Sequence, residues 1–133
     1  MQGGLRVKIR VYYEDTDAGG IVYHSKYINF CERARSELFF HHGMVPTEGE
    51  KSGFVVKHIE ADFLGSAMLG DLLSVTTTLL ERKHTSDTLM QEVYKEKQKL
   101  FSMHILLVYM ANGKISRIPE AFKTLLDAYQ TKA

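Results

Sequence analysis

The chain has 133 residues, 44% of them hydrophobic and 25% charged, and we expect one globular domain covering residues 1–133. Seventeen basic and sixteen acidic side chains give a formal net charge of +1, which excludes the strong positive field of proteins that bind nucleic acid. One cysteine excludes an internal disulfide. No apolar run approaches the roughly 20 residues of a membrane span, so we expect a cytoplasmic protein without a transmembrane segment.

The first predicted element is a strand over residues 5–11. Apolar residues alternate with basic ones from Leu5 to Val11, which is the period of a strand with one face on a core. A polar loop over residues 11–27 follows, rich in acids, glycine and tyrosine. Because a loop between two buried elements can hold reactive side chains in fixed positions, we expect the functional site here.

The period changes after this loop and predicts a long helix over residues 25–42. Ser25 is placed as its N-cap, and Gly43 followed by Pro46 predicts its end. Apolar residues recur three and four positions apart, as on the buried face of a helix. They are Tyr27, Phe30, Cys31, Ala34, Leu38 and Phe39.

Strand patterns return after the helix, over residues 55–63, 72–79, 88–96 and 101–110. The last of them is apolar on both faces, which is typical of an interior strand covered on each side. In the first, alternation predicts that one face is shared by Val55, Ile59, Ala61 and Phe63.

Two local signals complete the chain. Asn112-Gly113 predicts a tight hairpin turn, and Pro119-Glu120 opens a terminal helix with Phe122, Leu125, Leu126 and Tyr129 as its apolar stripe. One long helix followed by several antiparallel strands predicts an α+β domain in which the sheet wraps the helix. Such a sheet has unpaired edges, which dimerisation through those edges would cover.

Two segments carry a resemblance to a known family. The run from Asp17 to Tyr27 (DAGGIVYHSKY) and Glu32-Arg33-Ala34-Arg35 resemble the signature of hot-dog-fold acyl-CoA thioesterases. The most similar branch is YbgC, which is associated with Tol-Pal genes and is similar to the 4-hydroxybenzoyl-CoA thioesterases. The resemblance covers nearly the whole chain, although Ser66 stands where the family commonly has proline. It implies a hot-dog fold, no cofactor, and a homodimer with two sites at its interface, often paired into a homotetramer.

Thioester hydrolysis requires a group that attacks the carbonyl or activates water, and positive dipoles where the oxyanion develops. Asp17 is the candidate for the first role, as nucleophile or as general base, and both remain open. Gly19 and Gly20 allow close approach of a ligand. The amide of His24, at the positive end of the long helix, is the candidate oxyanion donor.

The resemblance implies supporting roles for the His24 ring and for the hydroxyl of Tyr13 at the end of the first strand. We expect Gly20, Val22 and Tyr23 to contact the substrate. The phosphates of coenzyme A imply basic side chains at the mouth of the pocket, for which Lys57 and His58 are candidates. An acyl carrier protein is a further expected partner.

Each candidate also has a purely structural interpretation. Asp17 favours turn and cap positions, and His24 fits an exposed helix start. Tyr12 and Tyr13 face opposite ways on an extended chain, so one of them is expected in the core.

The long helix offers structural interpretations as well. Glu32 and Arg35 are spaced as a helix ion pair, although Glu32 could also reach back to the loop. Cys31 lies on the apolar stripe and is expected to be buried rather than reactive.

Several other chemistries fail on spacing. Asp15-Thr16-Asp17 starts like a calcium loop, but Lys26 stands at the twelfth position where glutamate is needed. His41 and His42 are consecutive and point about 100° apart on a helix, so no metal site is expected. Neither a nucleotide P-loop nor a Gly-x-Ser-x-Gly nucleophile elbow is present.

Two alternatives to the hydrolase remain open. A binding protein for acyl chains or for acyl carrier protein would use the same residues without turnover. A hot-dog hydratase or dehydratase would instead add water to enoyl-CoA, which an absorbance assay for the enoyl group would detect.

Overall fold

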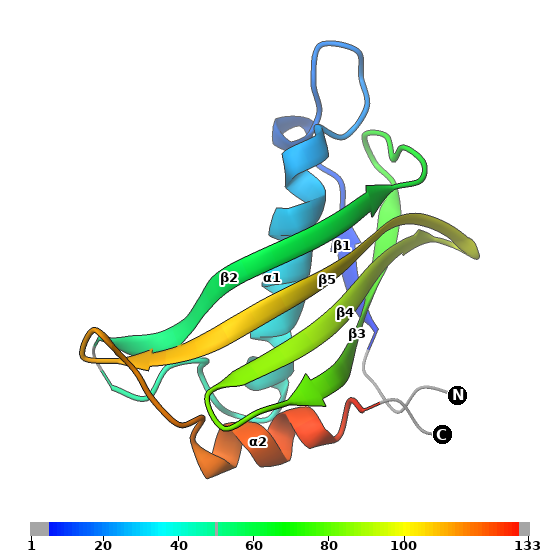
Figure 1. The fold of residues 1–133 in the computed structure, drawn as a ribbon. Coiled ribbons are helices and arrows are strands. Elements are labelled where there is room, and N and C mark those ends of the chain that lie inside the picture. Colours follow the sequence, from blue (N-terminus) through cyan, green and yellow to red (C-terminus); the bar gives the residue numbers. More distant parts are fainter. Residues whose placement is uncertain (1–5, 50, 131–133) are drawn as a thin grey trace.

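The structure is a computed structural model that describes residues 6–49 and 51–130. In these residues a curled antiparallel sheet wraps one face of a long helix (Figure 1), as the sequence predicts. The element order is β1 (Val7–Arg10), the short 3₁₀ helix η1 (Tyr13–Asp15), α1 (His24–His41), β2 (Ser52–Phe63), β3 (Leu72–Arg82), β4 (Ser86–Lys95), β5 (Gln98–Ala111), β6 (Lys114–Ile115) and α2 (Glu120–Asp127).

The described strands form one antiparallel sheet in the order β1-β3-β4-β5-β2, with β6 paired to β5. Consecutive strands from β3 to β5 are neighbours, whereas β1 and β2 lie at opposite edges. The predicted interior position of residues 101–110 is confirmed, because β5 pairs with both β4 and β2. Its outer face is only partly covered, since His104 is exposed.

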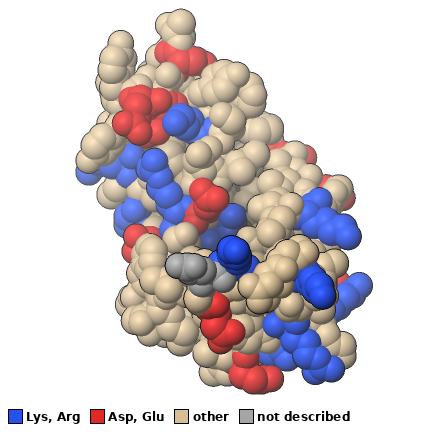
Figure 2. Space-filling view, turned by 90° about the vertical axis from the view of Figure 1, so that its left-hand side faces the viewer, with Lys and Arg blue, Asp and Glu red and all other residues tan. Residues whose placement is uncertain are grey.

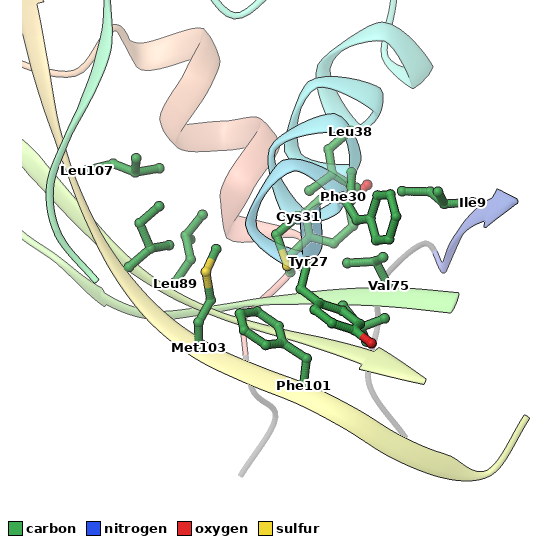
Figure 3. Packing of buried hydrophobic residues seen from close by; sticks show 14 of the residues in the cluster. Ile9, Tyr27, Phe30, Cys31, Leu38, Val75, Leu89, Phe101, Met103 and Leu107 are labelled. Atoms are coloured by element: carbon green, nitrogen blue, oxygen red, sulfur yellow. The ribbon is translucent and has the colours of Figure 1, made fainter. Parts of the chain in front are cut away.

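The core lies between α1 and the inner face of the sheet. Phe30, Cys31, Ala34 and Leu38 are completely buried, so the apolar stripe predicted for the helix is confirmed. Figure 3 shows this stripe facing side chains that the sheet contributes, among them Leu89, Phe101 and Met103. Burial of each large apolar side chain contributes about 1.5–3 kcal/mol, so this interface fixes the position of α1 on the sheet.

The ends of α1 agree with the prediction to within one residue, but its start is capped differently. Tyr23 is the N-cap and makes no side-chain cap bond, so the prediction for Ser25 is wrong. The amide of Tyr23 instead donates to the carbonyl of Asp15 in the preceding segment. At the other end Gly43 has φ of +72°, and its amide donates to Phe40 O at 3.0 Å. Met44 N donates to Phe39 O at 2.9 Å, which completes a glycine-terminated helix end.

The predicted shared face of β2 is confirmed for Ile59, Ala61 and Phe63, but it is wrong for Val55 because the strand contains a bulge. The pairing with β5 shifts between Val56 and His58, so Lys57 is an extra residue in the strand. An extra residue reverses the alternation of faces beyond it. Val55 is therefore 51% exposed, whereas Phe54 packs on Phe39 with ring centroids 6.4 Å apart.

The C-terminal part follows the sequence signals closely. Asn112 and Gly113 have φ of +52° and +78° and form the predicted tight turn, which leads into the short strand β6 that the sequence did not indicate. Pro119 is the N-cap of α2, and the predicted apolar stripe of that helix is buried. Leu5, at the start of the first predicted strand, lies outside the described residues.

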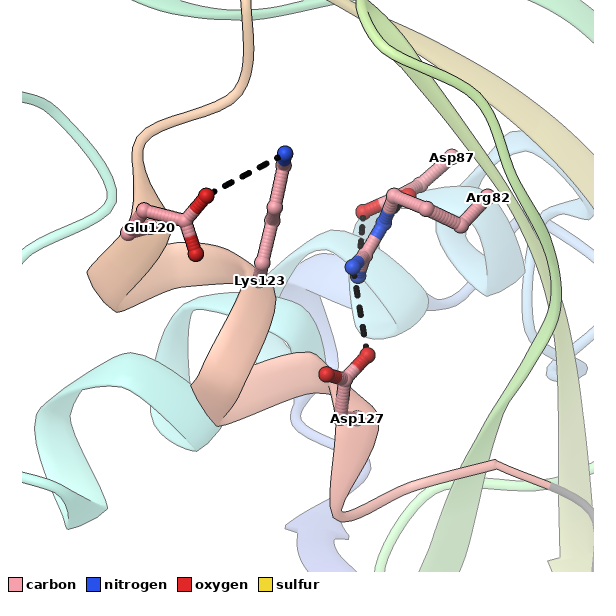
Figure 4. A network of polar contacts seen from close by, with 5 residues as sticks. All are labelled: Arg82, Asp87, Glu120, Lys123 and Asp127. Carbon is pink, nitrogen blue, oxygen red and sulfur yellow. Dashed lines mark hydrogen bonds and ion pairs between the residues drawn. The ribbon is translucent and has the colours of Figure 1, made fainter.

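A polar cluster attaches α2 to the sheet. Arg82 pairs with the fully buried carboxylate of Asp87 and donates to Asp127 Oδ1 of α2 at 3.1 Å (Figure 4). Lys123 pairs with Glu120 at 3.5 Å on the same helix. Burial raises the pKa of Asp87, while the hydrogen bond and charge of Arg82 oppose that shift.

The described helices include none that is both long and apolar enough to cross a lipid bilayer. Figure 2 views the molecule from the side of β2 and shows acidic and basic side chains mixed over that face. Acidic atoms gather at its upper end, and basic atoms are most concentrated at its lower right.

Candidate active site

The loop between η1 and α1 is closed at its base and rests on the connection between β2 and β3. Thr16 and Val22 form an isolated antiparallel bridge, and Asp17 N donates to Ile21 O at 2.9 Å. Val22 N donates to Ala67 O at 2.9 Å, and Ile21 bridges to Met68. Both segments lie together at one end of the molecule (Figure 1). The loop is therefore held at both of its ends by backbone hydrogen bonds.

Asp17 stands exposed on this loop with its carboxylate fixed. Its Oδ1 accepts the amide of Gly19 at 2.8 Å, and its carbonyl accepts the amide of Gly20 at 3.0 Å. Gly20 has φ of +84°, which an L side chain adopts only with strain. A Cβ on Gly19 would lie 3.3 Å from Asp17 Oδ1. The tandem glycines thus allow the turn, and Oδ2 accepts no hydrogen bond from the described residues.

Asp15 is a functional candidate that the sequence reasoning missed. It is only 2% exposed, its Oδ2 accepts the Tyr12 amide at 2.9 Å, and its carbonyl accepts the Tyr23 amide at 3.0 Å. Its Oδ1 is buried without a hydrogen-bond partner in the described residues, and Lys26 Nζ lies 4.0 Å away. Asp15 therefore connects the two flanks of the loop. No pattern in the residues distinguishes it from Asp17, because only the turn of η1 buries it.

The amides at the start of α1 divide into one that is occupied and one that is free. The Tyr23 amide is used by Asp15, whereas the described residues offer no acceptor to the His24 amide. An orphan amide at a helix N-terminus, reinforced by the helix dipole, is a donor for an anionic oxygen. The position of His24 N thus fits the role predicted for it.

The aromatic side chains proposed for the site, those of His24 and Tyr13, lie near the N-terminal end of α1. The His24 ring lies 4.3 Å from the Tyr23 ring and 6.2 Å from the Phe63 ring, measured between centroids. Neither the His24 ring nor the Tyr13 hydroxyl hydrogen-bonds to Asp17 in the described residues. Tyr13 lies on η1 rather than at a strand end, because β1 already ends at Arg10.

The prediction that Tyr12 or Tyr13 is in the core is wrong. Their side chains are 62% and 83% exposed, since the chain leaves the extended conformation at η1 and the strand alternation no longer applies. Both rings therefore remain available to a ligand or to a second subunit.

Tyr27 supports the site from inside the core, a role that its place on the apolar stripe does not reveal. Its hydroxyl accepts the Ala67 amide at 2.9 Å, and its ring stacks on Phe101 with centroids 5.4 Å apart. Burial raises the pKa of the Tyr27 hydroxyl. Because Ala67 in turn accepts the Val22 amide, Tyr27 ties α1, the β2–β3 connection and the loop together.

The predicted substrate contacts fall into two groups. Gly20 and Tyr23 are exposed on the loop, but Val22 is only 3% exposed and its side chain belongs to the core. Lys57 and His58 are exposed on β2, and His58 pairs with Glu60 at 3.2 Å. His58 is five residues from Phe63, the β2 residue next to His24, which separates it by about 16 Å along the strand.

The predicted ion pair between Glu32 and Arg35 is not formed. Arg35 instead donates to Gln91 Oε1 at 2.9 Å, and the fully buried Gln91 donates to Cys31 O and Thr77 Oγ1, both at 2.9 Å. Burial lowers the pKa of Arg35. The expectation for Cys31 is confirmed, since it is fully buried and burial raises its pKa to about 12.

The fold and the loop together define an α+β domain that presents a carboxylate beside the N-terminus of its wrapped helix. Residues 11–126 match the model of the thioesterase-like superfamily, and the chain belongs to this family. The predicted hot-dog fold is thereby confirmed.

Relatives of known name support the branch that the motifs resemble. The acyl-CoA thioesterase YbgC of Helicobacter pylori is 39% identical over 133 residues, covering 92% of this chain and 99% of that protein. The acyl-CoA thioester hydrolase YbgC of Escherichia coli is 37% identical over 106 residues, or 78% and 79% of the two chains. The crystal structure of a probable thioesterase from Bartonella henselae superposes with a TM-score of 0.81 at 31% identity, covering 87% and 99%.

Proposed function

We propose that this chain hydrolyses acyl-CoA thioesters to a free acid and coenzyme A, with Asp17 as the reacting carboxylate. The observation that carries the proposal is an exposed, hydrogen-bonded carboxylate on a loop that ends at a helix-terminal amide for which the described residues offer no acceptor. The relatives named acyl-CoA thioesterase and acyl-CoA thioester hydrolase support the activity, and the choice of Asp17 rests on the geometry of the loop.

The reaction needs few parts. Asp17 either attacks the thioester carbon, forming an anhydride that water then hydrolyses, or removes a proton from the attacking water. In both cases the C–S bond breaks, water supplies one oxygen of the new acid, and coenzyme A leaves as the thiol. The His24 amide stabilises the oxyanion. No step requires a cofactor.

The remaining contacts are assigned by position. Gly20 and Tyr23 line the approach to Asp17, and the His24 ring and the Tyr13 hydroxyl orient the substrate or water. Lys57 and His58 are proposed to contact the phosphates of the coenzyme A part of the substrate, which in an extended conformation is long enough to reach them from the loop. The cytoplasmic location and the acyl carrier protein as a partner stay predictions from the sequence.

We propose further that the active form is a homodimer or a homotetramer built from it. The free edge of β2 supports this proposal, because it is long and carries Val55, Val56 and Phe63 at 51%, 44% and 51% exposure. The edge strand β1 has only four residues. A second copy paired along β2 would cover apolar surface next to the His24–Phe63 contact and so complete the site.

Free-thiol release from acetyl-, butanoyl-, decanoyl-, palmitoyl- and benzoyl-CoA tests the activity. Turnover on at least one member is the expected result. Binding without turnover on every member would favour an acyl or acyl-carrier-protein binding role, and loss of enoyl absorbance from crotonyl-CoA without thiol release would favour a hydratase.

A further inference from the structure

Two hollows lie between α1 and β2, along the face of the helix that carries His24. At the end of this face nearest the candidate site, the His24 and Phe63 rings are in contact, with centroids 6.2 Å apart. One turn further, Ile28 and Ile59 line a small cavity of about 150 Å³. A larger cavity of about 420 Å³ follows, lined by apolar side chains that include Phe39, Phe54, Leu89 and Leu107.

Arg35 lies where these two cavities meet. Together with Glu32 it lines both of them, so a chain that fills the first cavity must pass these two side chains to enter the second. Glu32 is exposed and its carboxylate can swing into solvent. Arg35 is mostly buried, and its guanidinium is held by Gln91, which is itself fixed by two further hydrogen bonds. Arg35 is therefore the immobile member of the constriction.

We propose that Arg35 limits the length of the acyl chain that the enzyme accepts, an inference that rests on the proposed thioesterase activity. The apolar lining suits an aliphatic chain, and the guanidinium opposes its passage because displacing it would break the Gln91 bond and leave buried polar groups unpaired.

The position of Arg35 along the helix sets the maximum length of the acyl chain. It lies eleven residues after His24, which is about 16 Å along the helix axis. A zigzag chain with carbon–carbon bonds of about 1.5 Å advances about 1.25 Å per bond, so that distance corresponds to an acyl group of about 13 carbons. Shorter aliphatic acyl groups end before Arg35, and longer ones meet it.

The test compares kcat/KM for octanoyl-, lauroyl- and palmitoyl-CoA in the wild type, Arg35→Ala and Arg33→Ala. The wild type is expected to lose about tenfold in kcat/KM from lauroyl to palmitoyl. Arg35→Ala is expected to reduce that loss to less than about twofold. Arg33 is the matched control, since it is exposed and lines a separate hollow beside β1, and its variant should keep the wild-type profile.

Ratios between substrates are insensitive to a lower fraction of folded enzyme. If Arg35→Ala has too little turnover to measure, affinities of the three acyl-CoAs are compared in Asp17→Asn and in Asp17→Asn/Arg35→Ala, with the same shift expected. Equal chain-length profiles in the wild type and Arg35→Ala would overturn the proposal. Absence of turnover in the wild type on every acyl-CoA would instead overturn the proposed function.

Discussion

Asp15 and Asp17 lie two positions apart and occupy opposite environments. The Asp17 carboxylate is exposed, and the Gly19 amide is its one hydrogen-bond donor among the described residues. The Asp15 carboxylate is buried and accepts the Tyr12 amide, while the Asp15 carbonyl accepts the Tyr23 amide on the other flank of the loop. The first arrangement suits a group that reacts with a ligand. The second suits a positioning residue, which holds the loop without touching the substrate.

Asp15→Ala is expected to lower kcat by about tenfold or more with KM changed less than about twofold, because the loop shifts while the binding surface stays. The free energy of unfolding should fall by about 1–3 kcal/mol, since the Tyr12 amide loses its acceptor. Asp15→Asn keeps an acceptor oxygen and should recover most of kcat. Steady-state kinetics measure the change in kcat, and urea unfolding measures the change in the free energy of unfolding. Equal kcat values for Asp15→Ala and Asp15→Asn would contradict the positioning role of Asp15.

The elements were predictable where a single period runs through them, and less so where the chain changes conformation. The stripe of α1 and the Asn112-Gly113 turn followed from residue type and spacing. The bulge at Lys57 did not, because it depends on the register with β5 and leaves no mark in the residues. The short helix η1 was not predictable either. The alternating pattern of the sequence extends through Tyr12 and Tyr13, although the strand has already ended before them.

The residues of the candidate site were likewise predictable only where the local sequence indicates them. Asp17 and the His24 amide are candidates that the motif and the helix start after it already indicate. Asp15, Tyr27 and the Arg35–Gln91 contact depend on backbone groups or on partners 40 to 60 positions away. Such pairings arise from packing, which periodicity does not describe.

Tyr27→Phe tests how α1 and the β2–β3 connection hold the loop. The variant leaves the buried Ala67 amide without its acceptor, so the free energy of unfolding should fall by about 1–3 kcal/mol. Hydrogen exchange of the Ala67 and Val22 amides should increase more than that of β4. Unchanged exchange at both amides would show that Tyr27 does not support the loop.

Arg82→Met tests the attachment of α2 to the sheet. It removes the cation from the buried Asp87, so at pH 7 the free energy of unfolding should fall by about 3–5 kcal/mol. Burial keeps the pKa of Asp87 raised in the folded variant, so the protonated acid is favoured there and stability is lost as pH rises through that pKa. The difference from the wild type should therefore shrink as pH falls toward about 4, near the unfolded pKa. A stability difference independent of pH would show that the ionised Asp87 does not depend on Arg82.

At the scale of the whole molecule, the free edge of β2 predicts self-association. Sedimentation should give a mass of twice the 15.2 kDa of the chain, or four times for a tetramer. Val55→Asp places a charge on this exposed edge and should shift the protein toward monomers while thermal unfolding remains cooperative. A monomeric wild type, or a variant that associates as tightly as the wild type, would exclude this edge as the interface.

The most direct measurement is the kcat/KM of Asp17→Asn on the best acyl-CoA substrate, with Asp15→Asn as the matched control. Asparagine keeps an oxygen for the Gly19 amide at 2.8 Å, so the loop should retain its shape while the carboxylate is lost. We expect kcat/KM to fall by about 10²- to 10⁴-fold for Asp17→Asn and by less than about tenfold for Asp15→Asn. An Asp17→Asn enzyme with wild-type turnover would contradict Asp17 as the reacting group.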